Sequence, residues 1–163
     1  MEAYLGEKMN NKIEKYQIYE VIPGLFVGDY LSASQLWLLK KHSIKTTISC
    51  TDGHPPTHKL DGCEYRIYDV EDGSEKISDS EITCIVTDII DSMNRGSVLC
   101  TCFAGQSRSV SFVALAVAVI LDIGIDKAVD MAYRSRVAAN IHPRLLNRIY
   151  KYYYDVIIKE QTE

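Results

Sequence analysis

Short apolar runs and longer amphipathic stretches alternate along the chain from residue 18 onward. The short runs are rich in β-branched and aromatic residues, which favour strands. Strands are predicted at 25–27, 44–50, 64–68 and 97–101. The stretch at 109–121 is apolar on almost every side and too long for a typical strand, so it predicts a central, buried helix.

A second strong helix signal follows Ser78. Ser78 and Glu81 have the spacing of a capping box, and apolar residues recur every three or four positions between 82 and 93. The dipeptide Arg95-Gly96 is a typical helix end. This pattern predicts an amphipathic helix from about residue 79 to residue 94 that packs its apolar stripe on the core.

Further helices are predicted from capping signals alone. Either Ser32 or Ser34 is expected to cap one helix, in which Trp37 is available to the core. Asp126 is expected to cap the next. Pro143 stands near the first position of the last helix, where proline is favoured.

Strands that alternate with helices predict an α/β fold. We expect a single domain with a central, mostly parallel, twisted sheet and helices on both faces. Residues 1–16 are expected to form a flexible lead-in or a short extra helix, residues 17–158 the folded domain and residues 159–163 a tail.

Composition narrows the functional classes. With 163 residues, 47% hydrophobic and 25% charged, the chain has the balance of one ordinary globular domain. Its net charge of −4 gives no case for general nucleic-acid binding. The longest apolar run, 110–121, is shorter than the roughly 20 residues that span a bilayer. No signal peptide is expected, because residues 1–20 are polar and charged.

The cysteines indicate a reducing compartment. Five are scattered along the chain, and an odd number without a framework pattern argues against a secreted disulfide protein. We therefore expect a cytoplasmic protein, with the nucleus left open. Cys100 and Cys102 are too close for a usual zinc pair, and no histidine pair follows them, so neither a metal site nor a cofactor is predicted.

The stretch 101–109 carries the strongest chemical signal. Cys102 and Arg108 are separated by five residues, between a predicted strand and a predicted helix. Loop amides and a helix N-terminus attract anions, and a thiol there is expected to lose its proton more readily than a free cysteine. The planar guanidinium suits two phosphate oxygens. The pattern favours a nucleophilic thiolate beneath a bound phosphate, against the alternative of an inert core thiol and a surface arginine.

This stretch resembles the signature loop of the cysteine-dependent protein phosphatases, most closely their dual-specificity branch, which typically reads His-Cys-x-Ala-Gly-x-Ser-Arg-Ser. The matching residues are Cys102, Ala104, Gly105, Ser107, Arg108 and Ser109. Thr101 departs from the pattern, because it stands where the family usually has His. The segment 23–28 also resembles the family's opening strand, and the resemblance covers roughly residues 18–155. It implies a fold like that of protein tyrosine phosphatases and a catalytic domain.

The resemblance also implies roles for single residues. Cys102 would attack phosphorus, and the Ser109 hydroxyl would stabilise the sulfur as it leaves. The phosphoryl group would be held by Arg108 and by the loop amides of Phe103, Ala104, Gly105, Gln106 and Ser107. The implied activity is hydrolysis of phosphotyrosine and phosphoserine or phosphothreonine in proteins, through a cysteinyl-phosphate intermediate and without a cofactor.

A general acid is expected on the acidic loop that follows the strand at 64–68, where the family places an Asp. Asp72 is the first choice and Asp69 the alternative, while a merely solvated acidic loop stays open. Some family members carry a second cysteine near the nucleophile. Cys50 is therefore a candidate redox partner of Cys102, against the simpler interpretation of a core residue.

Other interpretations stay open. Thr101 favours, as an alternative, a catalytically weak phosphate-binding module like a pseudophosphatase, and an RNA 5′-phosphatase of the same superfamily is the other alternative. Arg134 and Arg136 form either a shallow basic rim for phosphate or a solvated helix end. His54 fits an exposed loop better than a substrate contact. The expected partner is a phosphorylated protein substrate; nothing indicates its identity or the oligomeric state.

Overall fold

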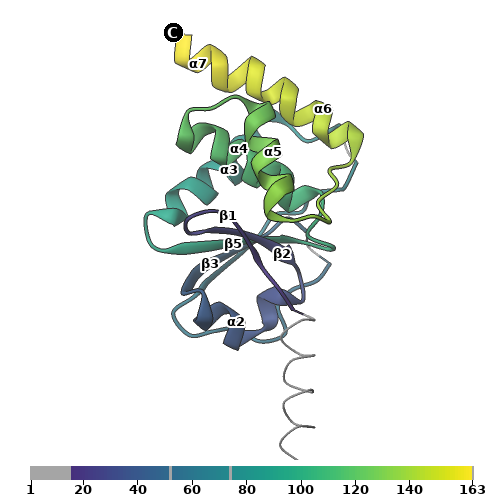
Figure 1. Cartoon of the computed structure of the whole chain (residues 1–163). Coiled ribbons are helices and arrows are strands. Elements are labelled where there is room, and N and C mark those ends of the chain that lie inside the picture. The colour runs from purple at the N-terminus through teal and green to yellow at the C-terminus, as the bar shows by residue number, and fades with distance from the viewer. Residues whose placement is uncertain (1–15, 52, 74, 163) are drawn as a thin grey trace, which may run out of the picture.

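The fold was analysed in a computed structural model that describes residues 16–51, 53–73 and 75–162 (Figure 1). The lead-in expected at residues 1–16 lies outside these ranges except for its last residue. The strands are β1 (Tyr19–Ile22), β2 (Leu25–Asp29), β3 (Ile44–Ser49), β4 (Glu64–Ile67) and β5 (Ser97–Cys102). The helices are η1 (Ser32–Ser34), α2 (Leu36–Lys41), α3 (Asp79–Met93), α4 (Arg108–Leu121), α5 (Ile125–Ser135), α6 (Pro143–Tyr152), η2 (Tyr153–Ile158) and α7 (Lys159–Thr162).

The five strands form one sheet in the order β1-β2-β5-β3-β4. The strands β2, β5, β3 and β4 are parallel, and β1 pairs antiparallel with β2 across the turn at Pro23-Gly24. In Figure 1, α2 lies on one face of the sheet and α3, α4, α5 and α6 on the other. The predicted α/β fold, with a mostly parallel sheet and helices on both faces, is confirmed.

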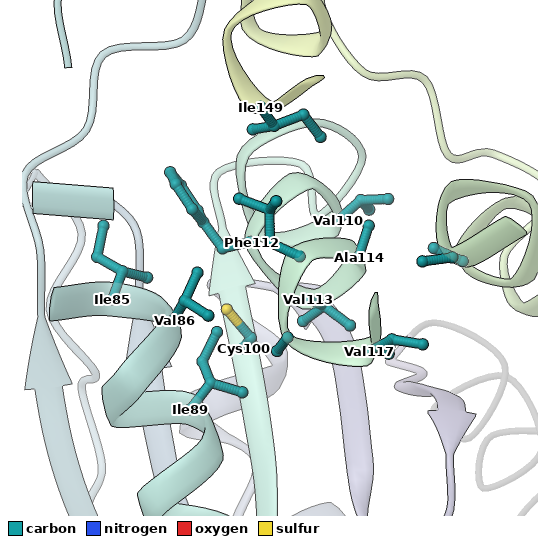
Figure 2. Close-up of a cluster of buried hydrophobic side chains, with 14 of the residues drawn as sticks. Ile85, Val86, Ile89, Cys100, Val110, Phe112, Val113, Ala114, Val117 and Ile149 are labelled. Carbon is teal, nitrogen blue, oxygen red and sulfur yellow. The ribbon is translucent and has the colours of Figure 1, made fainter. Parts of the chain in front are cut away.

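The core is centred on α4, as its sequence predicts. Every residue from Ser109 to Ala118 is buried, so the helix has no solvated face over this length. Figure 2 shows Phe112, Val113 and Val117 of α4 packed together with the apolar stripe of α3. Burial on this scale fixes the start of α4, and with it the loop that precedes the helix. Among the described residues, no helix is both long enough and apolar enough to cross a bilayer.

The capping box of α3 is confirmed. The Ser78 hydroxyl accepts a hydrogen bond from the Glu81 amide at 3.1 Å, and the Glu81 carboxylate accepts one from the Ser78 amide at 2.9 Å. Both groups lie within four residues of each other, so the interaction is local and readable from sequence. Pro143 likewise occupies the first position of α6, as predicted.

The predicted caps at Ser32, Ser34 and Asp126 are wrong. The Ser32 hydroxyl donates to Asp29, and Ser34 accepts from the amide of Thr57, so neither is available to α2. Gln35 and Gly124 stand at the N-caps of α2 and α5 instead, without side-chain caps. The carboxylate of Asp126 accepts from the Tyr150 hydroxyl on α6. Trp37, expected to reach the core, keeps 38% of its surface exposed.

Candidate functional site

Cys102 is the last residue of β5, the middle strand, and Arg108 is the first residue of α4. The five residues between them, 103–107, form a loop at the C-terminal edge of the parallel strands. Ligands bind at this edge in open α/β sheets, because loops and helix N-termini converge there. We call residues 103–107 the phosphate loop, after the role that the resemblance implies for them.

Cys102 is 2% exposed, and its Sγ lies 3.3 Å from the Oγ of Ser109 in the first turn of α4. Side chains alternate across a strand, so Cys102 faces the core beneath α3 and α4, while Thr101 faces the side of α2. There Thr101 lines a narrow cavity of about 10 Å³ together with Tyr30 and His54. Thr101, at the position where the family that the loop resembles usually has His, is thus a buried hydroxyl on the opposite face of β5 from the thiol.

Gly105 lets the phosphate loop close against β2. Its φ of +64° lies in the left-handed region, which glycine adopts without strain. A Cβ at this position would lie 2.4 Å from the carbonyl carbon and oxygen of Gly28 on β2. The turn therefore requires glycine for its backbone angle and for its space, and the loop is held in a compact arc above β5.

The guanidinium of Arg108 is anchored to the acidic loop between β4 and α3. Its Nη1 donates to the carbonyl oxygen of Val70 at 2.9 Å. Val70 is itself buried, so this end of the fork is fixed by a rigid partner. An arginine held at one nitrogen keeps a set direction, which favours bidentate binding of a phosphate by the remaining donors.

Of the two acid candidates, Asp72 contacts the phosphate loop. The Ser107 hydroxyl donates to Oδ1 of Asp72 at 2.7 Å, and the same hydroxyl accepts from the backbone amide of His142 at 2.9 Å. Asp69 lies elsewhere, in a shallow depression that it lines with Glu71 and other residues near the start of α3. The geometry therefore favours Asp72 over Asp69. No signal in the sequence pointed to His142.

The two candidate rim arginines lie in different surroundings. Arg134 is exposed and pairs with Asp130 one turn earlier on α5, as a solvated helix end would. Arg136 turns toward the phosphate loop, where its Nη2 donates to the carbonyl oxygen of Ala104 at 3.0 Å. Its guanidinium lies 4.8 Å from the centre of the Tyr19 ring, and two of its nitrogens are buried without a hydrogen-bond partner. Arg136 thus supports the loop from outside it.

Cys50 lies at the end of β3 with its Sγ 3.7 Å from the Sγ of Cys100. Both thiols are fully buried, and Figure 2 shows Cys100 pointing into the core between α3 and α4. The hydrogen bond with Cys50, together with burial, raises the pKa of Cys100 well above its ordinary value, which keeps it a thiol. The backbone amide of Cys50 donates to the carbonyl oxygen of Thr101, the residue before Cys102, so Cys50 lies on the strand next to the candidate nucleophile. A disulfide between Cys50 and Cys102 stays a prediction.

Three rings gather beside the phosphate loop. Tyr30 follows β2, His54 follows β3, and Phe103 is the first residue of the loop. The Tyr30 ring stacks on His54 at 4.4 Å and on Phe103 at 5.3 Å between ring centres. Phe103 still exposes 51% of its surface. An aromatic wall therefore stands next to Cys102, although the sequence favoured a plain loop for His54 and gave no signal for Tyr30.

Taken together, a buried thiol, an anchored guanidinium, a glycine-closed loop and a carboxylate lie at one edge of the sheet. This set can hold a tetrahedral oxyanion, attack it and move a proton. Among residues 16–51, 53–73 and 75–162, no group of three or more His, Cys, Asp or Glu side chains is arranged to bind a metal ion.

No protein-family model matches the sequence. The curated proteins similar to it include two mammalian dual specificity phosphatases. Human dual specificity protein phosphatase 22 is 27% identical over 122 residues, which is 74% of this chain and 65% of that protein. Mouse dual specificity protein phosphatase 15 is 29% identical over 125 residues, which is 76% of this chain and 52% of that protein. The chain thus spans between about half and two thirds of the length of these relatives.

The fold has a close counterpart among solved structures. A mouse putative dual specificity phosphatase, crystallised in complex with zinc tungstate, superposes with a TM-score of 0.80 at 19% sequence identity. The superposition covers 88% of this chain and 90% of that one. The family resemblance expected from the signature loop is confirmed in both sequence and fold.

Proposed function

We propose that this chain, which is similar in sequence and fold to dual-specificity protein phosphatases, hydrolyses phosphotyrosine and phosphoserine or phosphothreonine in proteins through a cysteinyl-phosphate intermediate. One observation carries the proposal. The buried thiol of Cys102 lies 3.3 Å from the Ser109 hydroxyl, directly below a glycine-closed loop that ends in the anchored Arg108. A hydroxyl, a cation and an uncapped helix start together stabilise negative charge on sulfur, which a purely structural thiol does not require.

In the first step, the phosphate oxygens bind to the loop amides and to Arg108, which offset the negative charge. The sulfur of Cys102 attacks phosphorus, so that a sulfur–phosphorus bond forms and the ester oxygen–phosphorus bond breaks. The leaving oxygen needs a proton, and the carboxyl group of Asp72 supplies it. The dephosphorylated side chain then departs from the site.

In the second step, water attacks the phosphorus of the cysteinyl phosphate. The carboxylate of Asp72 takes a proton from that water, the sulfur–phosphorus bond breaks and inorganic phosphate forms. Negative charge returns to sulfur as the bond breaks. The Ser109 hydroxyl, at 3.3 Å from that sulfur, can donate a hydrogen bond to it and so stabilise the leaving thiolate.

The mouse structural counterpart supports an oxyanion ligand, because tungstate is tetrahedral, as phosphate is, and that protein was crystallised with zinc tungstate. Protein substrates are proposed from the names of the curated relatives, dual specificity protein phosphatases 22 and 15. The aromatic wall of Tyr30, His54 and Phe103 also fits a phosphate ester that carries a ring.

Hydrolysis of 4-nitrophenyl phosphate tests the proposal. The wild type should turn over, and Cys102→Ser should lose at least about a thousandfold in rate, since a hydroxyl is a far weaker nucleophile at neutral pH. Cys84→Ser is the matched control, because Cys84 is an exposed cysteine on α3. A panel of phosphotyrosine peptide, phosphothreonine peptide and RNA 5′-phosphate then assigns the substrate class.

A catalytically weak phosphate-binding module is the second candidate, and Thr101 favours it. The family's usual His is replaced by a hydroxyl that is 1% exposed and faces away from the thiol. Such a protein would bind vanadate or a phosphopeptide through Arg108 and the loop amides, yet the wild type and Cys102→Ser would both fail to hydrolyse any ester in the panel.

A further inference from the structure

Ser107 stands at the N-cap of α4, yet its side chain makes no capping bond in that helix. An N-cap serine usually accepts from an amide of the first turn. The hydroxyl of Ser107 instead donates to Asp72 at 2.7 Å and accepts from the amide of His142 at 2.9 Å. A local capping bond has therefore been exchanged for two contacts that reach 35 residues away along the chain.

Three segments meet at this hydroxyl: the phosphate loop, the acidic loop between β4 and α3, and the connection between α5 and α6. The amide of Asn140 donates to the carbonyl oxygen of Gln106 at 2.8 Å, which ties the third segment to the first. The His142 ring packs on Gly73 so closely that a Cβ there would lie 2.8 Å from its Nε2. The residue after Asp72 is thus held from the side as well.

Both ends of the acidic loop are fastened to helices. At its start, Arg66 and Tyr68 bond the carboxylate of Asp88 on α3, and burial with that bond raises the pKa of Tyr68. At its end, Arg148 on α6 donates to the carbonyl oxygen of Ile77 at 2.9 Å. With the ends fixed, the bond from Ser107 sets the direction of the carboxylate in the middle of the loop.

From these contacts we propose that Ser107 is a positioning residue for the general acid. Its hydroxyl holds Asp72 over the phosphate loop, and it does not bind the substrate. The proposal rests on the function proposed above. A carboxyl group transfers its proton only within hydrogen-bond reach of the leaving oxygen, and a bond to one of its oxygens orients the whole planar group.

A double-mutant cycle tests this role. In the wild-type background, Ser107→Ala should lower kcat/KM, which reports the first step alone, roughly tenfold with phenyl phosphate, since general acid catalysis contributes about 10²–10⁴ and only part of it depends on position. The loss should be smaller with 4-nitrophenyl phosphate, whose leaving group needs less protonation. In the Asp72→Asn background, the same change should alter kcat/KM by less than about twofold, because the two residues act as one unit. Ser107→Thr, which keeps the hydroxyl, should restore most of the rate.

Two measurements separate positioning from other roles. Vanadate affinity should stay within about twofold of wild type in Ser107→Ala, because the hydroxyl is directed at Asp72 and not at the anion. Ser111→Ala is the matched control. This buried serine lies one turn later in α4, and its hydroxyl donates to the backbone carbonyl oxygen of Ser107. The rate of the Ser111→Ala variant should depend on the leaving group in the same way as the rate of the wild type.

The inference is overturned by any of three results: a tenfold loss that persists in the Asp72→Asn background, a parallel loss of vanadate affinity, or an equal loss with both leaving groups. A failed fold in Ser107→Ala is recognised by thermal unfolding, and Ser107→Gly then carries the same cycle, because glycine also removes the hydroxyl and is well tolerated at an N-cap. If the wild type hydrolyses neither ester, the proposed function has failed and not this inference.

Discussion

The hydroxyl of Ser109 lies 3.3 Å from the thiol of Cys102, and both side chains are buried where β5 passes into α4. Two buried polar groups in contact satisfy each other, so the pair is stable without a ligand. The contact also gives the sulfur a donor at the point where it becomes a leaving group. The contact between Ser109 and Cys102 therefore serves two roles: it satisfies two buried polar groups, and it provides a donor to the leaving sulfur.

Ser109→Ala should slow breakdown of the cysteinyl phosphate more than its formation. The expected loss in steady-state kcat is roughly ten- to a hundredfold, because removing one charge-stabilising donor typically costs up to about a thousandfold. Rapid-mixing kinetics with 4-nitrophenyl phosphate should then show a larger burst of nitrophenolate than the wild type shows. Loss of the burst together with kcat would place the hydroxyl in the first step.

Asp72→Asn and Asp69→Asn should differ. The first should lower kcat by a hundredfold or more, as expected for loss of a general acid. The second should change kcat by less than about tenfold, because Asp69 contributes to a depression away from the phosphate loop. A larger loss of kcat in Asp69→Asn than in Asp72→Asn would assign the acid role to Asp69. If neither substitution lowers kcat, the acidic loop contains no general acid.

Arg136 and Arg134 form a natural matched pair on the same helix end. Arg136→Ala removes the bond to the Ala104 carbonyl and the stacking on Tyr19, so vanadate affinity should fall roughly tenfold, in line with a lost charged hydrogen bond. Arg134→Ala should stay within about twofold, because its side chain is exposed and its partner among the described residues is Asp130, in a surface ion pair. Equal effects from both substitutions would contradict a loop-supporting role for Arg136.

The aromatic wall should favour phosphotyrosine over phosphothreonine. Aromatic contacts contribute about 0.5–1.5 kcal/mol, so Phe103→Ala should lower kcat/KM for a phosphotyrosine peptide roughly two- to tenfold. The value for a matched phosphothreonine peptide should change little. Phe103→Tyr keeps the ring and serves as the control. Equal losses on both peptides would mean that Phe103 shapes the phosphate loop and does not select the substrate.

Features governed by near neighbours could be predicted from the sequence. The capping box of Ser78 and Glu81, the buried α4 and the strand–loop–helix around Cys102 all depend on residues within one element or its immediate flank. The alternation of strands and helices predicted the fold class but not the order of the strands in the sheet. That order depends on which strands pair, and pairing is decided by tertiary contacts.

Features that depend on partners far along the chain could not be predicted from the sequence. Ser34 was expected as a possible helix cap, but it accepts from the amide of Thr57, 23 residues further along the chain, while the other candidate, Ser32, bonds the nearby Asp29. Capping propensity gives way when a tertiary partner competes for the same hydroxyl. Ser107 shows the same competition at the candidate site, where Asp72 and His142 arrive from loops far along the chain. The bonds of Ser107 to these two partners leave no local signal in the sequence, although Asp72 itself was a candidate acid.

The most direct test of the account is to trap the covalent intermediate. Wild-type protein mixed with excess labelled phosphate ester and denatured within milliseconds should carry phosphate on Cys102, located by mass spectrometry, at up to one per chain. Asp72→Asn should accumulate it on substrates with good leaving groups, because the attack of water is then slowed. Turnover without phosphate on Cys102, or a Cys102→Ser variant as active as wild type, would contradict the account.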